Sequence, residues 1–397
     1  MMYTRRRKNT SWPIVVGAFG LGAAVTLAAL PLLAGPMAES LIRLPERLVH
    51  GPASAPESST AVEQAPTALE IDNVSRWVDD GSKAMQSGQW QAALQSFDQA
   101  TEVDPGATVA LSRGALALLR QNKPADGLER ARRAYETAPT SAEANRVLAL
   151  ALDWNNQFDA AIPAASRAIT ADPQSAEAHA YLAEAYVDAY RLPEAEEAVG
   201  RALALDGLSP EVHRVKGYLA ESRGDYDAAV AEYQRAVELA PGYSYLHLNL
   251  GHALRASKRY EEARAVFVRA AQLNSQDARP LGGLGMVAYA IEDYEGATGY
   301  LRQAIAIDPR YVNGYAQLGW VFYVQKQYEQ ALPNFERAIE LEKDRTRVAQ
   351  YLHAVGWVHL NAQRFQQSRA AFEKALEIAP DLVGARDGLK TLGNRGR

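Results

Sequence analysis

The sequence predicts an all-α protein in which a solenoid of helix–turn–helix repeats follows one N-terminal transmembrane helix. A pattern of proline, alanine and glycine recurs every 34 residues through most of the chain, and a fixed period of this size is typical of stacked structural repeats. Near the N-terminus, a long uncharged segment follows a cluster of cations. A chain of 397 residues, with 48% hydrophobic and 22% charged residues, is expected to fold as several modules or as one elongated array.

The composition excludes several kinds of chemistry. The chain has no cysteine, which removes disulfides, thiol nucleophiles and cysteine-based metal sites. Its net charge is −5 although Arg5, Arg6, Arg7 and Lys8 make the N-terminal tail basic, so the remainder is more acidic than the total. Because nucleic-acid binding needs a basic face, no nucleic-acid partner is expected.

Residues 1–10 are predicted to form a cytoplasmic basic tail, and residues 11–38 a transmembrane signal anchor. No charged residue occurs between Ser11 and Ala38, and a spanning helix needs roughly 20 apolar residues. Cations that precede such a segment tend to stay in the cytoplasm, so the rest of the chain is expected on the other side of the membrane. The alanine-rich, cysteine-free chain suits a single-pass protein of a bacterial inner membrane with its repeats extracytoplasmic.

A cleaved signal peptide is the alternative for this segment. The apolar region of a signal peptide is usually about 7–15 residues long and ends at an A-x-A-like site. The segment here is longer, and the best candidate site, after Ala38, has Pro36 two positions before it. The small-xxx-small spacing of Gly20 and Ala24 is compatible with pairing of two such helices, so a homo-oligomer formed through these helices or the repeats is one expectation.

Residues 39–73 are predicted to be a linker rich in proline, serine and alanine. Pro45, Pro52, Pro56 and Pro66 occur there among small and polar residues. Such a stretch buries too little apolar surface to fold by itself, so it is expected to act as an extended spacer.

Nine repeats are predicted over residues 74–382, followed by a capping helix and tail over residues 383–397. The repeats begin at Val74, Thr108, Ala142, Ala176, Pro210, Ser244, Ala278, Val312 and Ala349. Position 8 of each repeat is glycine or alanine, and position 27 is alanine. Position 17 is aromatic in most repeats, and several repeats close with a proline at position 32, at Pro105, Pro139, Pro173, Pro241, Pro309 and Pro380.

This pattern predicts two short antiparallel helices in each repeat. At about 100° per residue, positions 4, 7, 8 and 11 share one face of the first helix, and positions 20, 24 and 27 share one face of the second. Small residues at positions 8, 20 and 27 let the helices approach, while larger residues at position 24 fill the remaining space. Proline at position 32 ends the second helix because it lacks an amide hydrogen and disfavours helix in the residue before it. One helix pair cannot cover its own apolar face, so the pairs are expected to stack.

These residues resemble the consensus of the tetratricopeptide repeat family. The resemblance rests on Leu-Gly at positions 7 and 8, as in Leu250-Gly251, with an aromatic at 17, alanine at 20 and 27, phenylalanine at 24 and proline at 32. It covers residues 74–382, and the second repeat departs from it with Pro124 at position 17 and Gly127 at position 20. The family implies a right-handed superhelix whose first helices line a concave groove that binds peptides or protein segments.

Positions 2, 5, 9 and 12 of the first helices are expected to face this groove, roughly 140° from the packing face. The later repeats carry aromatic residues and arginine at these positions, and such residues anchor interfaces. We expect Trp320, Tyr323 and Trp357 to form a partner-binding patch; the alternative is that they pack against neighbouring first helices. The full set of candidate partner-binding residues is Arg214, Tyr218, Tyr245, His252, Arg255, Arg279, Met286, Tyr289, Trp320, Tyr323 and Trp357.

No catalytic, metal or cofactor site is expected. His179, His213 and His247 recur at position 4, but equivalent positions on stacked helices lie roughly 8–10 Å apart, too far to share one zinc ion. Gly283-x-Gly285 imitates part of a dinucleotide-binding fingerprint but lies within a predicted helix. The lysine and asparagine with which some family members clamp a terminal carboxylate are absent from positions 5 and 9.

The sequence therefore predicts a non-enzymatic, membrane-tethered scaffold that captures protein segments, in envelope assembly, secretion or surface-structure biogenesis. One alternative is an anchored regulator or receptor whose repeats face the cytoplasm. Another is a non-catalytic subunit of a transferase or hydrolase complex. The repeats cover residues 74–382 and leave no room for a catalytic domain, which argues against an enzyme.

Overall fold

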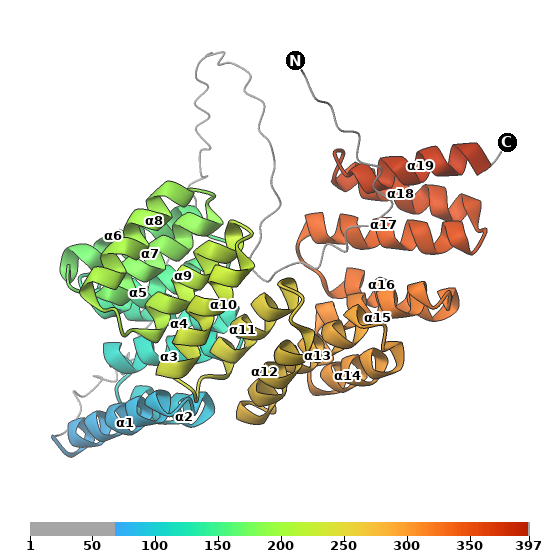
Figure 1. Cartoon of the computed structure of the whole chain (residues 1–397). Coiled ribbons are helices and arrows are strands. Elements are labelled where there is room, and N and C mark those ends of the chain that lie inside the picture. Colours follow the sequence, from blue (N-terminus) through green and yellow to red (C-terminus); the bar gives the residue numbers. More distant parts are fainter. Residues whose placement is uncertain (1–67, 396–397) are drawn as a thin grey trace, which may run out of the picture.

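The structure, a computed structural model, describes residues 68–395. Within this range it contains nineteen α-helices and no strand, arranged as a curved stack of helical hairpins (Figure 1). The predicted basic tail and transmembrane segment, and all but the end of the predicted linker, lie outside the described residues. None of the described helices is both long enough and apolar enough to cross a membrane.

Each hairpin consists of a first helix, a tight turn and a second helix. The first helices are α1 (Ala68–Gln86), α3 (Thr108–Arg120), α5 (Ala142–Asp153), α7 (Ala176–Asp188), α9 (Pro210–Ser222), α11 (Ser244–Ala256), α13 (Ala278–Ala290), α15 (Val312–Val324) and α17 (Arg345–Asn361). The second helices are α2 (Trp90–Val103), α4 (Pro124–Thr137), α6 (Phe158–Ala171), α8 (Leu192–Leu205), α10 (Tyr226–Leu239), α12 (Tyr260–Leu273), α14 (Tyr294–Ile307), α16 (Tyr328–Leu341) and α18 (Phe365–Ile378). A single helix, α19 (Val383–Arg395), follows the last hairpin.

Most helices begin at the same two positions of the repeat, position 1 and position 17. The odd-numbered helices from α3 to α15 each begin at position 1 of their repeats. Helices α1 and α17 begin earlier, ahead of Val74 and Ala349, which are position 1 of the first and last repeats. Every second helix begins at position 17, which explains why Pro124 is tolerated there. Proline fits the first position of a helix because the amide at that position has no partner within the helix.

Two positions of the repeat set the distance between the helices of a hairpin. The alanine at position 27 has no exposed surface in any of the nine hairpins. At position 8, a Cβ added to Gly251 would lie 2.6 Å from Cε1 of Phe267, and one added to Gly356 would lie 2.4 Å from Cε1 of Phe372. The ring at position 24 therefore packs on the bare backbone of position 8, as the size pattern predicts.

A left-handed residue forms the turn inside every hairpin. Position 15 has a positive φ in all nine repeats, although glycine occupies it only at Gly88 and Gly224. The other seven are Asn122, Asn156, Tyr190, Lys258, Glu292, Lys326 and Gln363, with φ between 57° and 64°. A left-handed residue lets the chain reverse sharply at the end of the first helix, as in common helix C-terminal motifs.

The first six hairpins form a coil that closes on itself. Trp90 of α2 packs on Tyr243 and Tyr245 at the start of α11, with ring centroids 5.0 and 5.9 Å away. Leu118 of α3 and Leu246 of α11 belong to the same buried cluster. Figure 1 shows α1 and α2 lying beneath α10 and α11, whereas α13 to α19 extend away from this contact. The solenoid thus has a closed first part and an open second part.

Candidate partner-binding groove

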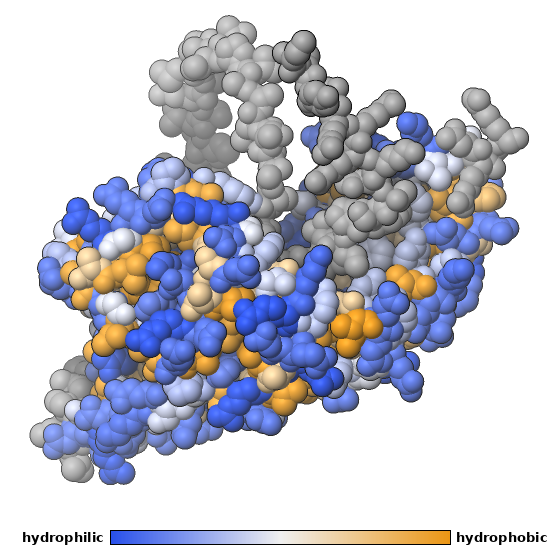
Figure 2. Space-filling model, viewed as in Figure 1, coloured by the Kyte–Doolittle hydropathy of each residue, from blue (hydrophilic) through white to orange (hydrophobic). Residues whose placement is uncertain are grey.

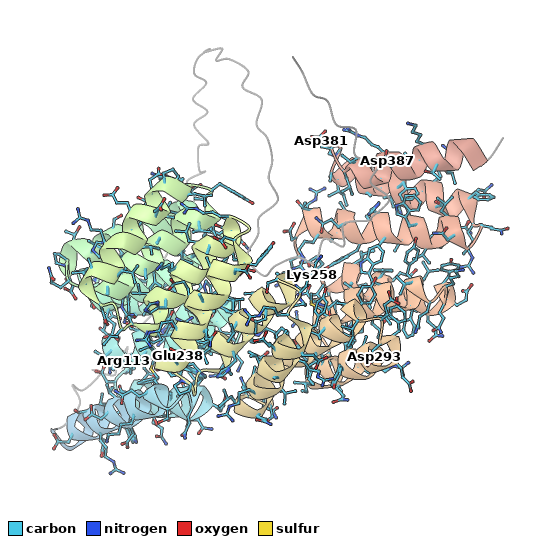
Figure 3. All side chains as sticks on the ribbon, in the orientation of Figure 1. Arg113, Glu238, Lys258, Asp293, Asp381 and Asp387 are labelled. Atoms are coloured by element: carbon cyan, nitrogen blue, oxygen red, sulfur yellow. The ribbon has the colours of Figure 1, made fainter. Side chains whose placement is uncertain are left out.

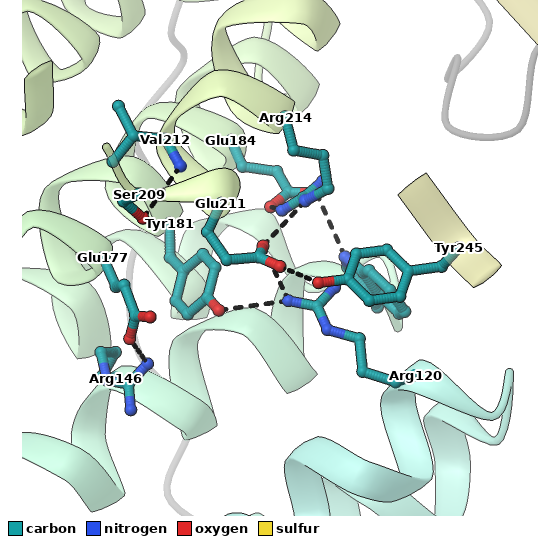
Figure 4. Close-up of polar contacts among 11 residues, drawn as sticks. Arg120, Arg146, Glu177, Tyr181, Glu184, Ser209, Glu211, Val212, Arg214 and Tyr245 are labelled. Carbon is teal, nitrogen blue, oxygen red and sulfur yellow. Dashed lines mark hydrogen bonds and ion pairs between the residues drawn. The ribbon is translucent and has the colours of Figure 1, made fainter. Parts of the chain in front are cut away.

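The concave side of the closed part is filled by a buried polar network (Figure 4). Arg120 of α3 forms an ion pair of 2.8 Å with Glu211 of α9. Glu211 also accepts from Arg214 Nε at 2.9 Å and from the hydroxyl of Tyr245. Arg214 in turn donates from Nη1 to Glu184 of α7 at 2.9 Å. These five side chains come from four first helices, and all are buried.

The charges of this network compensate one another. Burial alone would raise the pKa of Glu211, but the guanidinium groups of Arg120 and Arg214 lower it to about 2. Burial opposes ionisation of Arg120, yet the carboxylate of Glu211 raises its pKa. The guanidinium of Arg120 also lies 4.3 Å from the ring centroid of Tyr245, within cation–π distance. The interior of the closed part is therefore charged, paired and inaccessible.

A second polar group, on α5 and α7, contains a buried carboxyl. Asp153 of α5 is 2% exposed, and neither of its carboxylate oxygens meets a conventional donor among the described residues. Its acidic neighbour is Asp188 on α7, whose charge disfavours ionisation of Asp153 and whose carboxylate accepts from the hydroxyl of Tyr218. Burial raises the pKa of Asp188 to about 7 and that of Asp153 well above its usual range. Each of the two carboxyl groups therefore keeps its proton to a higher pH than an exposed aspartate does.

Four candidate groove residues lie in the interior, contrary to the prediction that such positions are free to bind. Arg214, Tyr218 and Tyr245 are at most 9% exposed and bond to Glu184, Asp188 and Glu211 within the chain. Met286 is also buried. Arg214 and Tyr218 are buried by packing on α7, the first helix of the neighbouring repeat, whereas Tyr245 is buried by closure of the coil, which brings Arg120 of α3 over its ring.

The remaining candidate residues lie on the concave side at intermediate exposure. They are His252, Arg255, Arg279, Tyr289, Trp320, Tyr323 and Trp357. On α15, the ring of Trp320 packs edge-on against Tyr323 at 5.5 Å and against buried Phe335 at 5.3 Å. Each ring thus rests on the core and keeps another part of its surface accessible.

The patch expected at Trp320, Tyr323 and Trp357 is linked by Asn361 of α17. The Asn361 amide donates to the Tyr323 hydroxyl at 2.8 Å and to the backbone carbonyl of Trp357 at 3.1 Å. The indole Nε1 of Trp357 donates to His353 Nε2 at 2.8 Å. These hydrogen bonds fix the rings in place, which lowers the entropy cost of binding a partner on them.

The outer surface differs in character from this groove. Charged side chains such as Glu238, Lys258 and Asp293 are exposed on it (Figure 3). The face seen in Figure 2 is mainly hydrophilic, with apolar residues in scattered patches. Scattered apolar residues are usual on protein surfaces and do not by themselves indicate an interface.

Two of the histidines at position 4 form hydrogen bonds to nearby groups of the chain. His247 is buried and hydrogen-bonds the Pro241 carbonyl at 3.0 Å, and His213 contacts Glu232 at 2.8 Å. Over residues 68–395, no group of three histidine or acidic side chains is arranged to hold a metal ion. The concave side therefore offers aromatic, amide and guanidinium groups for contact with a partner.

These features define an α-solenoid with a concave face built from its first helices. Models of the tetratricopeptide repeat family match residues 112–176, 155–217, 220–286 and 311–381. The chain is a tetratricopeptide repeat protein. Proteins built from these repeats bind protein partners and are typically not catalytic.

Comparison with solved structures agrees with this fold. The chain is similar to one described as the crystal structure of the APC/C hetero-tetramer Cut9-Hcn1, with a TM-score of 0.61 and 17% identity over 76% of this chain and 59% of that one. It thus spans about three fifths of that relative's length. A structure of pilF from Pseudomonas aeruginosa gives a TM-score of 0.45 at 17% identity, covering 55% of this chain and 98% of the other, too weak a match to support an inference. No curated protein matches the sequence.

Proposed function

We propose that this protein is a membrane-anchored scaffold that binds partner protein segments on the concave face of its open part, over α13, α15 and α17. The observation that carries the proposal is the run of half-buried aromatic side chains, Tyr289, Trp320, Tyr323 and Trp357, on three successive first helices. Rigid aromatic rings that are part buried and part accessible are typical anchors of protein interfaces.

The contrast between the two parts of the coil supports this location. In the closed part, the residues at the same repeat positions bind one another, as Arg214 binds Glu184 and Tyr245 binds Glu211. A partner that entered there would have to replace buried ion pairs, at a cost of several kcal/mol. In the open part, Tyr289, Trp320, Tyr323 and Trp357 keep part of their surface exposed among the described residues, so a partner can contact them without replacing a buried ion pair.

The experiment is the combined replacement of Trp320, Tyr323 and Trp357 by alanine in the full chain. We expect proteins crosslinked to it in native membranes to be lost while the helical circular dichroism signal is largely retained. Phe365→Ala is the matched control, because Phe365 is 43% exposed at the start of α18 and outside the groove. Unchanged crosslinking by the triple variant contradicts the proposal, and collapse of the helical signal supports a packing role for the rings instead.

We further propose that residues 11–38 anchor the chain with its repeats extracytoplasmic, in envelope assembly, secretion or surface-structure biogenesis. The support is the uncharged segment between Ser11 and Ala38 and the cations at Arg5, Arg6 and Arg7 that precede it. A phosphatase that is active only outside the cytoplasm, fused after Arg397, is expected to be active. Activity of a cytoplasm-specific reporter at the same place would favour the alternative of an anchored regulator whose repeats face the cytoplasm.

A further inference from the structure

The first helices of the open part, and α11 beside them, carry no acidic residue. Helices α11, α13, α15 and α17 contain four arginines, Arg255, Arg279, Arg345 and Arg347, and neither aspartate nor glutamate. By contrast, α5, α7 and α9 each carry at least two acidic residues. These helices therefore differ in charge from α5, α7 and α9 of the closed part.

Two of the four arginines already have carboxylate partners. Arg279 binds Asp277 with Nη2 at 2.7 Å, and Arg347 binds Glu342 at 3.1 Å. Arg345 is exposed at the first position of α17. Arg255 differs from all three, because it is half-buried and forms no hydrogen bond or ion pair with any described residue.

The environment of Arg255 favours an anion from outside the chain. Its Nε is buried without an acceptor, and a buried donor without a partner costs about 1–3 kcal/mol. The acidic residue that faces it, Glu221 of α9, accepts a hydrogen bond from Tyr233 at 3.0 Å and lies beyond ion-pair distance of Arg255. His252, one turn before Arg255, is uncharged at neutral pH, since burial lowers its pKa to about 3. The guanidinium group is thus partly exposed and has no ion-pair partner among the described residues.

Arg255 stands in a row with two of the groove aromatics. Arg255, Tyr289 and Tyr323 all occupy position 12 of successive repeats, and each lies beside the residue at position 17 of its own repeat. Equivalent positions on packed helices are about 8–10 Å apart. A polyproline-II segment rises about 3.1 Å per residue with three residues per turn, so side chains three residues apart share a face about 9 Å apart. The two spacings match.

We propose, as a refinement that rests on the proposed function, that the groove selects an extended acidic segment whose carboxylate binds Arg255 and whose apolar side chains, three and six residues away, pack on Tyr289 and Tyr323. The carboxylate is supplied by an aspartate or glutamate of the partner. Arg255 supplies the selectivity for charge, and the two tyrosines supply contact area. This arrangement differs from the lysine–asparagine clamp for a chain terminus, which the sequence lacks.

The test is selection of a randomised twelve-residue peptide library on the full chain in detergent. We expect selected peptides to be enriched in aspartate or glutamate three residues from an apolar side chain. Arg255→Gln should reduce the preference for a glutamate peptide over its glutamine counterpart by about tenfold or more, equal to about 1.4 kcal/mol. Arg255→Glu should select lysine or arginine at the same place.

The outcomes separate this inference from the proposed function. Arg302→Gln is the matched control, because Arg302 is an exposed arginine of α14, a second helix, and should leave the selection unchanged. Selected peptides without acidic enrichment, or an acidic preference that persists in Arg255→Gln, overturn the role of Arg255 while leaving the groove as the binding surface. If no peptide is selected by the unaltered chain, the inference fails together with the proposed function.

Discussion

Arg120 and Glu211 form an ion pair of 2.8 Å in which both side chains are buried, although they belong to the second and fifth repeats. A contact between repeats so far apart is unusual for a solenoid, in which each repeat contacts mainly its neighbours. Here it joins α3 to α9 across the concave side, and Trp90 of α2 packs on Tyr243 beside it. The pair therefore joins two first helices that α5 and α7 separate along the solenoid.

We predict that Arg120→Met lowers the free energy of unfolding of the closed part by about 3 kcal/mol, because it leaves the buried Glu211 with only one of its two arginines. Hydrogen exchange of the amides of α2 and α11, measured at increasing urea concentration, gives this free energy of unfolding. The double variant Arg120→Met, Glu211→Leu should recover part of the loss, since it removes the unpaired charge. Arg264→Met, in an exposed pair with Glu261, is the control and should change stability by less than about 1 kcal/mol.

The carboxyl pair of Asp153 and Asp188 predicts a pH dependence. An unfolded aspartate ionises near pH 3.9, whereas burial raises the pKa of Asp188 to about 7 in the folded chain. Between these values the unfolded chain has released the proton and the folded chain retains it. The stabilisation from the pair is therefore complete below about pH 4 and is lost as the pH rises through about 7.

Asp188→Asn should flatten this dependence and raise stability at pH 8 by about 1–2 kcal/mol, because the amide donates to Asp153 without ionising. Thermal unfolding at pH 5 and pH 8 tests it. Glu211 acts in the opposite direction and in another window, since its pKa is lowered to about 2 and its contribution is lost only as the pH falls below about 4.5. If stability changes with pH between 4 and 7 in the variant as it does in the unaltered chain, Asp188 is not the source of this dependence.

The left-handed turn residues predict a stabilising substitution. Tyr190 is 52% exposed and has a φ of 57°, a conformation that costs a side-chain-bearing residue roughly 1–2 kcal/mol. Tyr190→Gly should therefore stabilise the chain by about 0.5 kcal/mol after the entropy cost of glycine is included. The converse change, Gly224→Ala, should destabilise it, because Gly224 has a φ of 77° at the same repeat position. If Tyr190→Gly and Gly224→Ala changed the free energy of unfolding in the same direction, this account would be contradicted.

The close approach of positions 8 and 24 predicts a steric effect. Gly251→Ala places a Cβ 2.6 Å from the Phe267 ring and should destabilise the chain by about 1–3 kcal/mol. Adding Phe267→Leu should recover part of this loss. Gly299→Ala is the matched control, because nothing lies within 4 Å of the added Cβ, and it should stabilise α14 by about 0.5–1 kcal/mol. Chemical denaturation of the three variants and the unaltered chain compares them directly.

The hairpins could be predicted from the sequence because their determinants are local. The alanines at position 27, for example Ala100 and Ala375, are fully buried as the pattern predicts, and α3 begins at Thr108 as counted. The left-handed position 15 was missed, because Tyr190 and Glu292 stand where glycine would have signalled it. A chain reversal between two packed helices imposes that conformation even on residues that disfavour it.

Closure of the coil could not be predicted from the repeat pattern. The curvature of a solenoid is the sum of small rotations between neighbours, and the consensus residues do not encode it. Arg214 and Tyr245 were therefore assigned to an open groove, and Arg120 was overlooked. The signal that could have indicated closure is the presence of opposite charges, Glu184, Glu211 and Arg214, at concave positions where the later repeats carry aromatic residues.

The central claim is that partners bind the open part of the concave face, and site-specific photo-crosslinking tests it most directly. A photoreactive phenylalanine analogue would replace Tyr289, Tyr323, Tyr190 or Phe365 in turn in the full chain, in its own membranes. The account predicts partner adducts at Tyr289 and Tyr323, and few or none at the exposed control positions Tyr190 and Phe365. Adducts formed mainly at Tyr190 or Phe365 would contradict it and would place the partner on another face of the solenoid.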